Sequence, residues 1–168
     1  MRATIGVRPG TVLVIVIGLA SLAAEANQAG RAKRDLPPAV AKVVAENKPG
    51  AEIDKLTIEK EHGVTVFDFE FKANRGEMDV TPDGTVLDVA TVIEMKDLPE
   101  AVAAVIRKEA GKRPIKQLTR SEVRAEIVPD AGKGRVVKLE TPKYVYEAEF
   151  SNDEIEVAAD GTIIKKGK

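Results

Sequence analysis

The sequence predicts an α+β protein of two tandem repeats, each with one helix packed on an antiparallel β-meander. Three observations predict this fold class. Positions 67–85 match positions 144–162 without a gap, including an Asp-Gly-Thr turn in each copy. The related runs LPPAVAKV and LPEAVAAV precede the two copies, beginning at Leu36 and Leu98. Both copies alternate apolar and polar residues, which is typical of half-buried strands.

The N-terminus has the three parts of an export signal. Arg2 and Arg8 form a positive region, the run TVLVIVIGLASL is apolar, and Ala24-Glu25-Ala26 places small residues before a cut. This pattern predicts a signal peptide over residues 1–26, with cleavage after Ala26. An uncleaved N-terminal anchor is the alternative. The polar residues 27–35 predict a flexible leader.

The first repeat is expected over residues 36–95. A helix over 36–48 has Asp35 as a possible cap and Pro37 and Pro38 in its first turn, and Pro49-Gly50 ends it. Its apolar side chains recur at helical spacing, so one side should be buried. A strand over 53–60 and a turn at His62-Gly63 lead into the matching hairpin.

The second repeat is expected over residues 97–168. Its helix, 98–108, has Asp97 as the expected cap and ends at Gly111. Leu36 to Phe67 spans 31 positions and Leu98 to Tyr144 spans 46, so this repeat carries an insertion. The insertion should contain a turn over 129–134 and a strand over 135–140. Such an extension is a second candidate contact surface.

Alternation gives each matching hairpin two chemically different faces. The apolar side, with Phe67, Phe69 and Phe71 in one copy and Tyr144 and Tyr146 in the other, should lie beneath the helices. The other side is acidic in both copies and is the candidate binding face. Its eight carboxylates are Asp68, Glu70, Glu77, Asp79, Glu147, Glu149, Glu154 and Glu156.

Like charges directly across an antiparallel pair are unfavourable, so nearby cations should interleave with these acids. The basic residues expected to do so are Lys55, Lys72, Arg124 and Lys138. Two interpretations of the acidic side stay open. It recognises something cationic, or it is only the solvated side of an antiparallel sheet.

Composition excludes several functions. The net charge of −1 provides no electrostatic footprint for nucleic acid, and 4% aromatic residues provide no stacking platform. The chain has no Cys, so thiolate metal sites and disulfides are absent. Its only His, His62, sits in an expected turn, where a solvent-exposed role is favoured over catalysis. We therefore expect no enzyme activity, no cofactor and no dedicated metal site.

The helix-then-meander order, the strand YVYEAEF (144–150), the acidic strand EIEV (154–157) and the Asp-Gly-Thr turn resemble the PepSY-like families. The tandem arrangement is similar to the β-lactamase-inhibitor-like fold, in which two units present a sheet to a partner. This resemblance covers about residues 36–168. It implies an extracytoplasmic location and, loosely, binding or inhibition of a peptidase or another envelope protein.

The expected function is thus a secreted or periplasmic non-enzymatic binding module with a protein or peptide partner. Contact with the membrane is expected only through the export signal. The first alternative is an envelope protein that binds a small ligand or a divalent cation on the acidic face. The second is a purely structural envelope protein.

Overall fold

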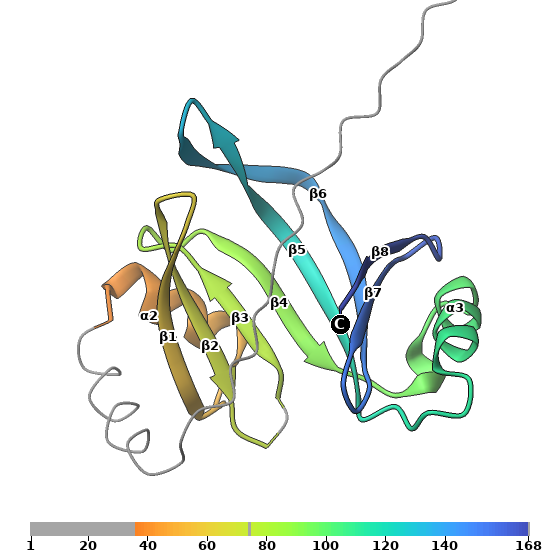
Figure 1. Ribbon diagram of the computed structural model, residues 1–168. Coiled ribbons are helices and arrows are strands. Elements are labelled where there is room, and N and C mark those ends of the chain that lie inside the picture. The colour runs from red at the N-terminus through yellow and green to blue at the C-terminus, as the bar shows by residue number, and fades with distance from the viewer. Residues whose placement is uncertain (1–35, 74, 168) are drawn as a thin grey trace, which may run out of the picture.

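The computed structural model describes residues 36–73 and 75–167. In this part of the chain a helix and four strands are followed by a short 3-10 turn, a second helix and four further strands. The predicted signal peptide and leader lie outside the described residues. The strands form one eight-stranded antiparallel sheet in the order β1 to β8, so each pairs with its neighbour in sequence (Figure 1).

The predicted fold class, two tandem helix-plus-meander repeats, is wrong in its architecture. β4 (Val86–Val92) pairs with β5 (Gln117–Asp130) from Asp88 opposite Val123 to Val92 opposite Thr119. This pairing joins all eight strands into a single sheet, and two helices of the described residues lie on it. The physical reason is edge pairing, because separate sheets would leave β4 and β5 as edges with unpaired backbone groups.

The remaining strands lie close to the predicted positions, with one merger. The strand expected over 135–140 and the matching strand around Tyr144 are parts of one long strand, β6, which meets the long strand β5 at a turn of Ala131 and Gly132. The bounds of the other strands are β1 (Ile53–Glu61), β2 (Val64–Phe71), β3 (Glu77–Val80), β6 (Lys133–Glu149), β7 (Glu154–Ala158) and β8 (Ile163–Lys166).

The two helices, α2 (Pro38–Asn47) and α3 (Glu100–Ala110), fall where the sequence places them. Among the described residues, no helix is long and apolar enough to cross a membrane. Gly111, with φ +58, ends α3 as predicted. Asp97 does not cap α3. It accepts a hydrogen bond from Glu94 N and closes the 3-10 turn η1 (Met95–Asp97), while Pro99 occupies the N-cap of α3.

Each helix covers one part of the sheet and builds an apolar cluster there. Val40 and Val44 of α2 pack on Phe67, Phe69, Phe71, Met78 and Val80, which is the predicted apolar side of the first hairpin. Val102 and Ile106 of α3 pack on Tyr146, Ala148, Phe150, Ile155 and Val157. Tyr144 is an exception to the prediction, because it is 41% exposed.

Both helices lie on the same face of the sheet. Val89 packs with the cluster under α2, and Thr91 projects to the same side two residues later. Thr91 pairs with Arg120, which pairs with Tyr146 of the cluster under α3. The polar residues that alternate with these positions therefore all point to the opposite face.

The opposite face is partly closed by the β5–β6 extension. Val66, Leu87, Ala125 and Ile127 form a third buried cluster on this side, joined by Val64 and Val136. Gly134 of β6 donates a backbone hydrogen bond of 2.6 Å to the carbonyl of His62, which ties the extension to the β1–β2 turn. The sheet is consequently curled, with the helices on its outer side (Figure 1).

Replacing Gly134 with Ala should lower the free energy of unfolding by about 1–3 kcal/mol, because the added methyl group would overpack the site. An added Cβ would lie 2.8 Å from Ile127 Cγ2 and 2.9 Å from Val64 Cγ2. Urea unfolding measures the effect. Gly132→Ala is not a suitable control because of its φ of +87, so the exposed Lys133→Ala, with little expected change, serves instead. A Gly134→Ala protein as stable as wild type would contradict the packing described.

Candidate functional site: the carboxylate face

The eight predicted carboxylates all lie on the sheet face opposite the helices. They come from four strands, β2, β3, β6 and β7, and each alternates with residues buried under a helix. We call this surface the carboxylate face and define it by nine residues, the eight predicted and one further aspartate: Asp68, Glu70, Glu77, Asp79, Asp88, Glu147, Glu149, Glu154 and Glu156.

The strand register places these acids directly opposite one another. Asp68 faces Asp79 and Glu70 faces Glu77 across β2 and β3. Across β6 and β7, Glu147 faces Glu156 and Glu149 faces Glu154. Directly opposed like charges destabilise a sheet by about 0.2–1 kcal/mol per pair. These opposed pairs therefore add no stability of their own, and the apolar packing on the other side of the sheet favours this register.

Asp88 on β4 is the functional candidate that sequence reasoning missed. It lies opposite Asp79 and extends the acidic row across β2, β3 and β4. The sequence contains a signal for Asp88. If a hairpin turns at Asp83-Gly84, positions at equal distances from the turn pair, and position 79 then lies opposite position 88. Asp88 is only 3% exposed, and its Oδ2 accepts no hydrogen bond from any described residue.

The burial of Asp88 follows from local structure. β3 and β4 have a register irregularity between Asp79 and Val80, which opposes Val80 to Val86 and leaves Leu87 between two paired positions. Leu87 joins the third apolar cluster beside β5 and β6. The adjacent Asp88 is thus covered by the same curl of the sheet that buries this cluster.

Cations reach only some of these carboxylates. Lys55 lies 2.9 Å from Glu70, Lys116 lies 3.5 Å from Glu149, and Lys165 lies 2.8 Å from Glu154 and 3.3 Å from Glu156. Of the basic residues predicted to interleave, only Lys55 pairs with the face. Lys72 pairs with Glu52 and Arg124 with Glu122, and no described ion pair involves Lys138. Within the described residues, Asp68, Glu77, Asp79, Asp88 and Glu147 have no cation within ion-pair distance.

Those five carboxylates also have raised pKa values, chiefly because burial disfavours their charged form. Burial and then the neighbouring Glu70 and Glu59 raise the pKa of Asp68 to about 6. Burial followed by nearby acids raises the pKa of Glu77 and that of Glu147 to about 7. Burial raises the pKa values of Asp79 and Asp88 too, with further contributions from nearby carboxylates in each case.

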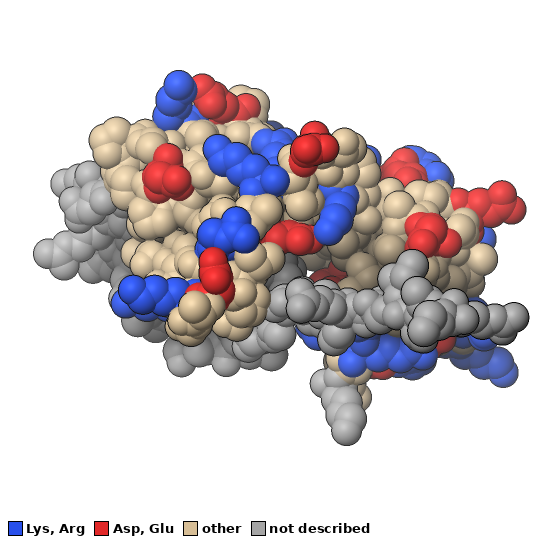
Figure 2. All heavy atoms as spheres, turned by 90° about the horizontal axis from the view of Figure 1, so that it is seen from above, with Lys and Arg blue, Asp and Glu red and all other residues tan. Residues whose placement is uncertain are grey.

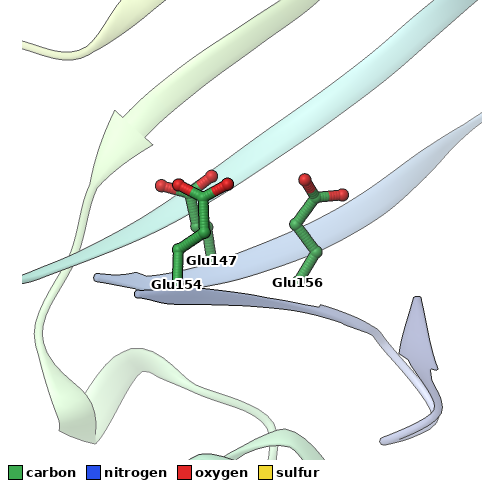
Figure 3. A group of neighbouring side chains, drawn as sticks. All are labelled: Glu147, Glu154 and Glu156. Atoms are coloured by element: carbon green, nitrogen blue, oxygen red, sulfur yellow. The ribbon is translucent and has the colours of Figure 1, made fainter. Parts of the chain in front are cut away.

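One group of three carboxylates has metal-site spacing. Glu147, Glu154 and Glu156 each place one oxygen within 4.8 Å of the others, and Figure 3 shows them rising from β6 and β7. The Lys165 ammonium contacts two of the three at ion-pair distance. A cation is therefore already built into this group, and a metal ion would have to displace it.

The charge pattern elsewhere on the surface is mixed. Figure 2, which views the molecule from above, shows Lys and Arg interspersed with Asp and Glu. His62 is exposed in the turn between β1 and β2 with φ +48, as the sequence predicts. The chemistry that distinguishes the carboxylate face is thus an excess of acceptor oxygens over the cations that accompany them.

No protein-family model matches the chain, and no curated protein matches it. Several solved structures do. A protein from Bacteroides eggerthii that is described as putatively periplasmic has 16% identity and a TM-score of 0.48, and the match covers 78% of this chain and 87% of that chain. A DUF2874 family protein from Bacteroides uniformis has 15% identity and a TM-score of 0.48, with coverages of 77% and 87%.

A third solved structure is described as a BLIP-like protein, from Bacteroides fragilis. It has 13% identity and a TM-score of 0.44, and the match covers 78% of this chain and 84% of that chain. At these values the likeness carries no argument about function. The PepSY-like assignment stays a prediction.

Proposed function

We propose that the protein is an extracytoplasmic, non-enzymatic binding module whose carboxylate face binds a cationic segment of a protein or peptide partner. The observation that supports this proposal is the set of five carboxylates without a cation, Asp68, Glu77, Asp79, Asp88 and Glu147. A face that serves only as the wet side of a sheet has no need to keep such groups half-buried and unpaired, because exposed acids cost much less.

The structure also supports the choice of a cationic guest. Lys and Arg side chains can donate to several carboxylate oxygens at once, and their charge offsets the repulsion between opposed acids. Binding of a cationic segment would thus offset the repulsion that destabilises this face in the free protein. Electrostatic recognition of this kind depends strongly on salt and is steered over long range.

In the test, the chain from residue 27 onward is used to capture binding partners from an envelope extract of the cells that produce the protein. A variant with Asp68→Asn, Glu77→Gln and Glu147→Gln removes three unpaired acids. A control with Glu46→Gln, Glu94→Gln and Glu100→Gln removes three acids away from this face, at the helices and the η1 turn, for the same change in net charge. We expect one partner to be retained by wild type and by the control, and lost by the face variant.

The captured partner is then titrated directly, at low and moderate salt. The face variant should bind it at least about tenfold more weakly, which corresponds to about 1.4 kcal/mol, because unpaired charges are removed from the contact. Equal binding by all three proteins would overturn the proposed surface. Absence of any captured protein, with binding of a small ligand instead, would favour the competing prediction of a small-ligand protein.

A further inference from the structure

The β3–β4 and β7–β8 hairpins match in sequence and in register. Each turns at Asp-Gly-Thr, and each has its register irregularity at the same place, after Asp79 in one and after Glu156 in the other. Asp79 and Glu156 therefore occupy equivalent positions. Their cross-strand partners do not match, because Asp79 faces Asp88 whereas Glu156 faces Lys165.

In the β7–β8 hairpin, Lys165 supplies a cation to the acids around it. Its Nζ lies 2.8 Å from Glu154 Oε1 and 3.3 Å from Glu156 Oε1, and its side chain is only 19% exposed. A half-buried ammonium in such a position balances carboxylates that have lost much of their hydration. This hairpin thus carries its own counter-ion.

In the β3–β4 hairpin the equivalent position holds Asp88, a carboxylate instead of a cation. Asp88 is almost wholly buried, and its Oδ2, like Glu156 Oε1, accepts no hydrogen bond from a described residue. Glu156 has the ammonium of Lys165 at 3.3 Å, whereas no described cation lies at ion-pair distance from Asp88. The charge of Lys48 acts on Asp88 and opposes the rise in its pKa, but Lys48 Nζ donates its hydrogen bonds to the carbonyls of Arg75 and Ala90, at 2.7 Å each. Lys55 is engaged with Glu70. A buried carboxylate left in this state is costly.

The two hairpins differ in the charge that these equivalent positions carry. Glu154, Glu156 and Lys165 together carry −1 when ionised, whereas the equivalent Glu77, Asp79 and Asp88 carry −3. A cation of charge +2 removes the difference. The available ligands are carboxylate oxygens only, which suit hard ions such as Ca²⁺ and Mg²⁺ and not the softer metals that need Cys or His.

We propose that a hard divalent cation binds between Asp79 and Asp88, where the other hairpin holds the ammonium of Lys165. The two carboxylates supply protein ligands and water completes the coordination, as is common for Mg²⁺ sites. Asp68, opposite Asp79 on its other side, adds negative charge to the site. This inference does not rest on a protein partner, since it concerns the free protein.

The experiment is a calorimetric titration of the chain from residue 27 onward, stripped of metal with a chelator, with CaCl2 and with MgCl2. We expect saturable binding of one ion per chain for at least one of the two, with Kd about 10⁻⁴–10⁻³ M. A saturating concentration should raise Tm by about 5 °C relative to the chelated protein. No binding of either ion at about 10 mM, well above that range, would overturn the proposal.

Three variants locate the ion. Asp88→Asn should weaken binding at least about tenfold by removing one charged ligand. Asp88→Lys should abolish binding, because it places in this hairpin the ammonium that Lys165 provides in the other. Glu154→Gln is the matched control, since it removes a carboxylate from the Glu147, Glu154 and Glu156 group and should leave binding unchanged. Loss of binding in the control but not in the Asp88 variants would place the ion at the group of Glu147, Glu154 and Glu156, and would overturn the proposal.

Discussion

Replacing Lys165 with Met is expected to lower the free energy of unfolding by about 3 kcal/mol near neutral pH, because it removes the only cation between two largely buried carboxylates. The side chains of Glu154 and Glu156 are 20% and 10% exposed, and Lys165 lies within 3.3 Å of both. Met keeps most of the apolar stem of Lys, so the loss reports the charge and not the packing. Urea unfolding at neutral pH measures it.

The same measurement at a lower pH, about 5, separates charge from packing. Burial raises the pKa of Glu156 and Lys165 opposes that rise, so removal of Lys165 favours the protonated form and the cost should shrink as pH falls. Lys166→Met is the control. Lys166 pairs with Glu109 at 2.8 Å, but its side chain is 55% exposed, so its loss should change stability by no more than about 0.5 kcal/mol. A Lys165→Met protein as stable as wild type near neutral pH would show that these acids need no counter-ion.

The chelated wild-type protein is expected to be more stable at about pH 5.5 than at about pH 8.5, by about 2–4 kcal/mol. Folding raises the pKa of Asp68 to about 6 and those of Glu77 and Glu147 to about 7. A group whose pKa is higher in the folded state holds its proton more tightly there. Its stabilising effect is complete below the unfolded pKa and is lost as pH rises through the folded pKa. The magnitude is discounted because these side chains are partly exposed to solvent.

Carboxylates with lowered pKa values act in the opposite sense, but at a lower pH. Hydrogen bonds from Thr81 and the Thr85 backbone lower the pKa of Asp83, and a backbone hydrogen bond from Thr162 lowers that of Asp160. Their stabilising effect is present above the unfolded pKa and is lost as pH falls below about 4. The change in stability from about pH 5.5 to 8.5 therefore reports the carboxylates with raised pKa values and not those with lowered ones.

Urea unfolding across this window, in the presence of a chelator, measures the prediction. A double variant with Glu77→Gln and Glu147→Gln should show a flatter dependence, because two of the titrating groups are gone. The double variant Glu94→Gln and Glu100→Gln, at solvent-exposed positions, is the control and should retain the wild-type slope. Stability that is constant or rises with pH in the wild-type protein would contradict the raised pKa values.

The carboxylate face is a source of instability in the free protein. Opposed acids, an almost wholly buried aspartate and a lack of counter-ions all lower stability near neutral pH. Proteins tolerate such features most readily at functional sites, where a ligand recovers the cost. A divalent ion at Asp88 and a cationic partner elsewhere on the face would each do so, and the variants above distinguish them.

The amino-acid sequence by itself determined the local elements and the side to which each strand residue points. Apolar positions at helical spacing located α2 and α3, and strict alternation placed Phe69 under a helix and Glu70 on the opposite face. Local signals suffice here because both periodicities are properties of short stretches of backbone. The expected cap Asp97 was wrong because Asp97 accepts a hydrogen bond from Glu94 N instead, a contact that spacing does not reveal. The buried position expected for Tyr144 was wrong too, since its side chain is 41% exposed.

Only the tertiary structure decided that the strands form one sheet and that the carboxylate face has unequal halves. The β4–β5 pairing joins segments separated by a helix, and nothing in either strand specifies its partner. Asp88 is almost wholly buried, next in sequence to Leu87 of the third apolar cluster, and the register sets its carboxylate opposite Asp79 while Lys165 lies opposite Glu156. Burial and counter-ions depend on distances through space, so a sequence pattern alone cannot tell a solvated acid from an unbalanced one.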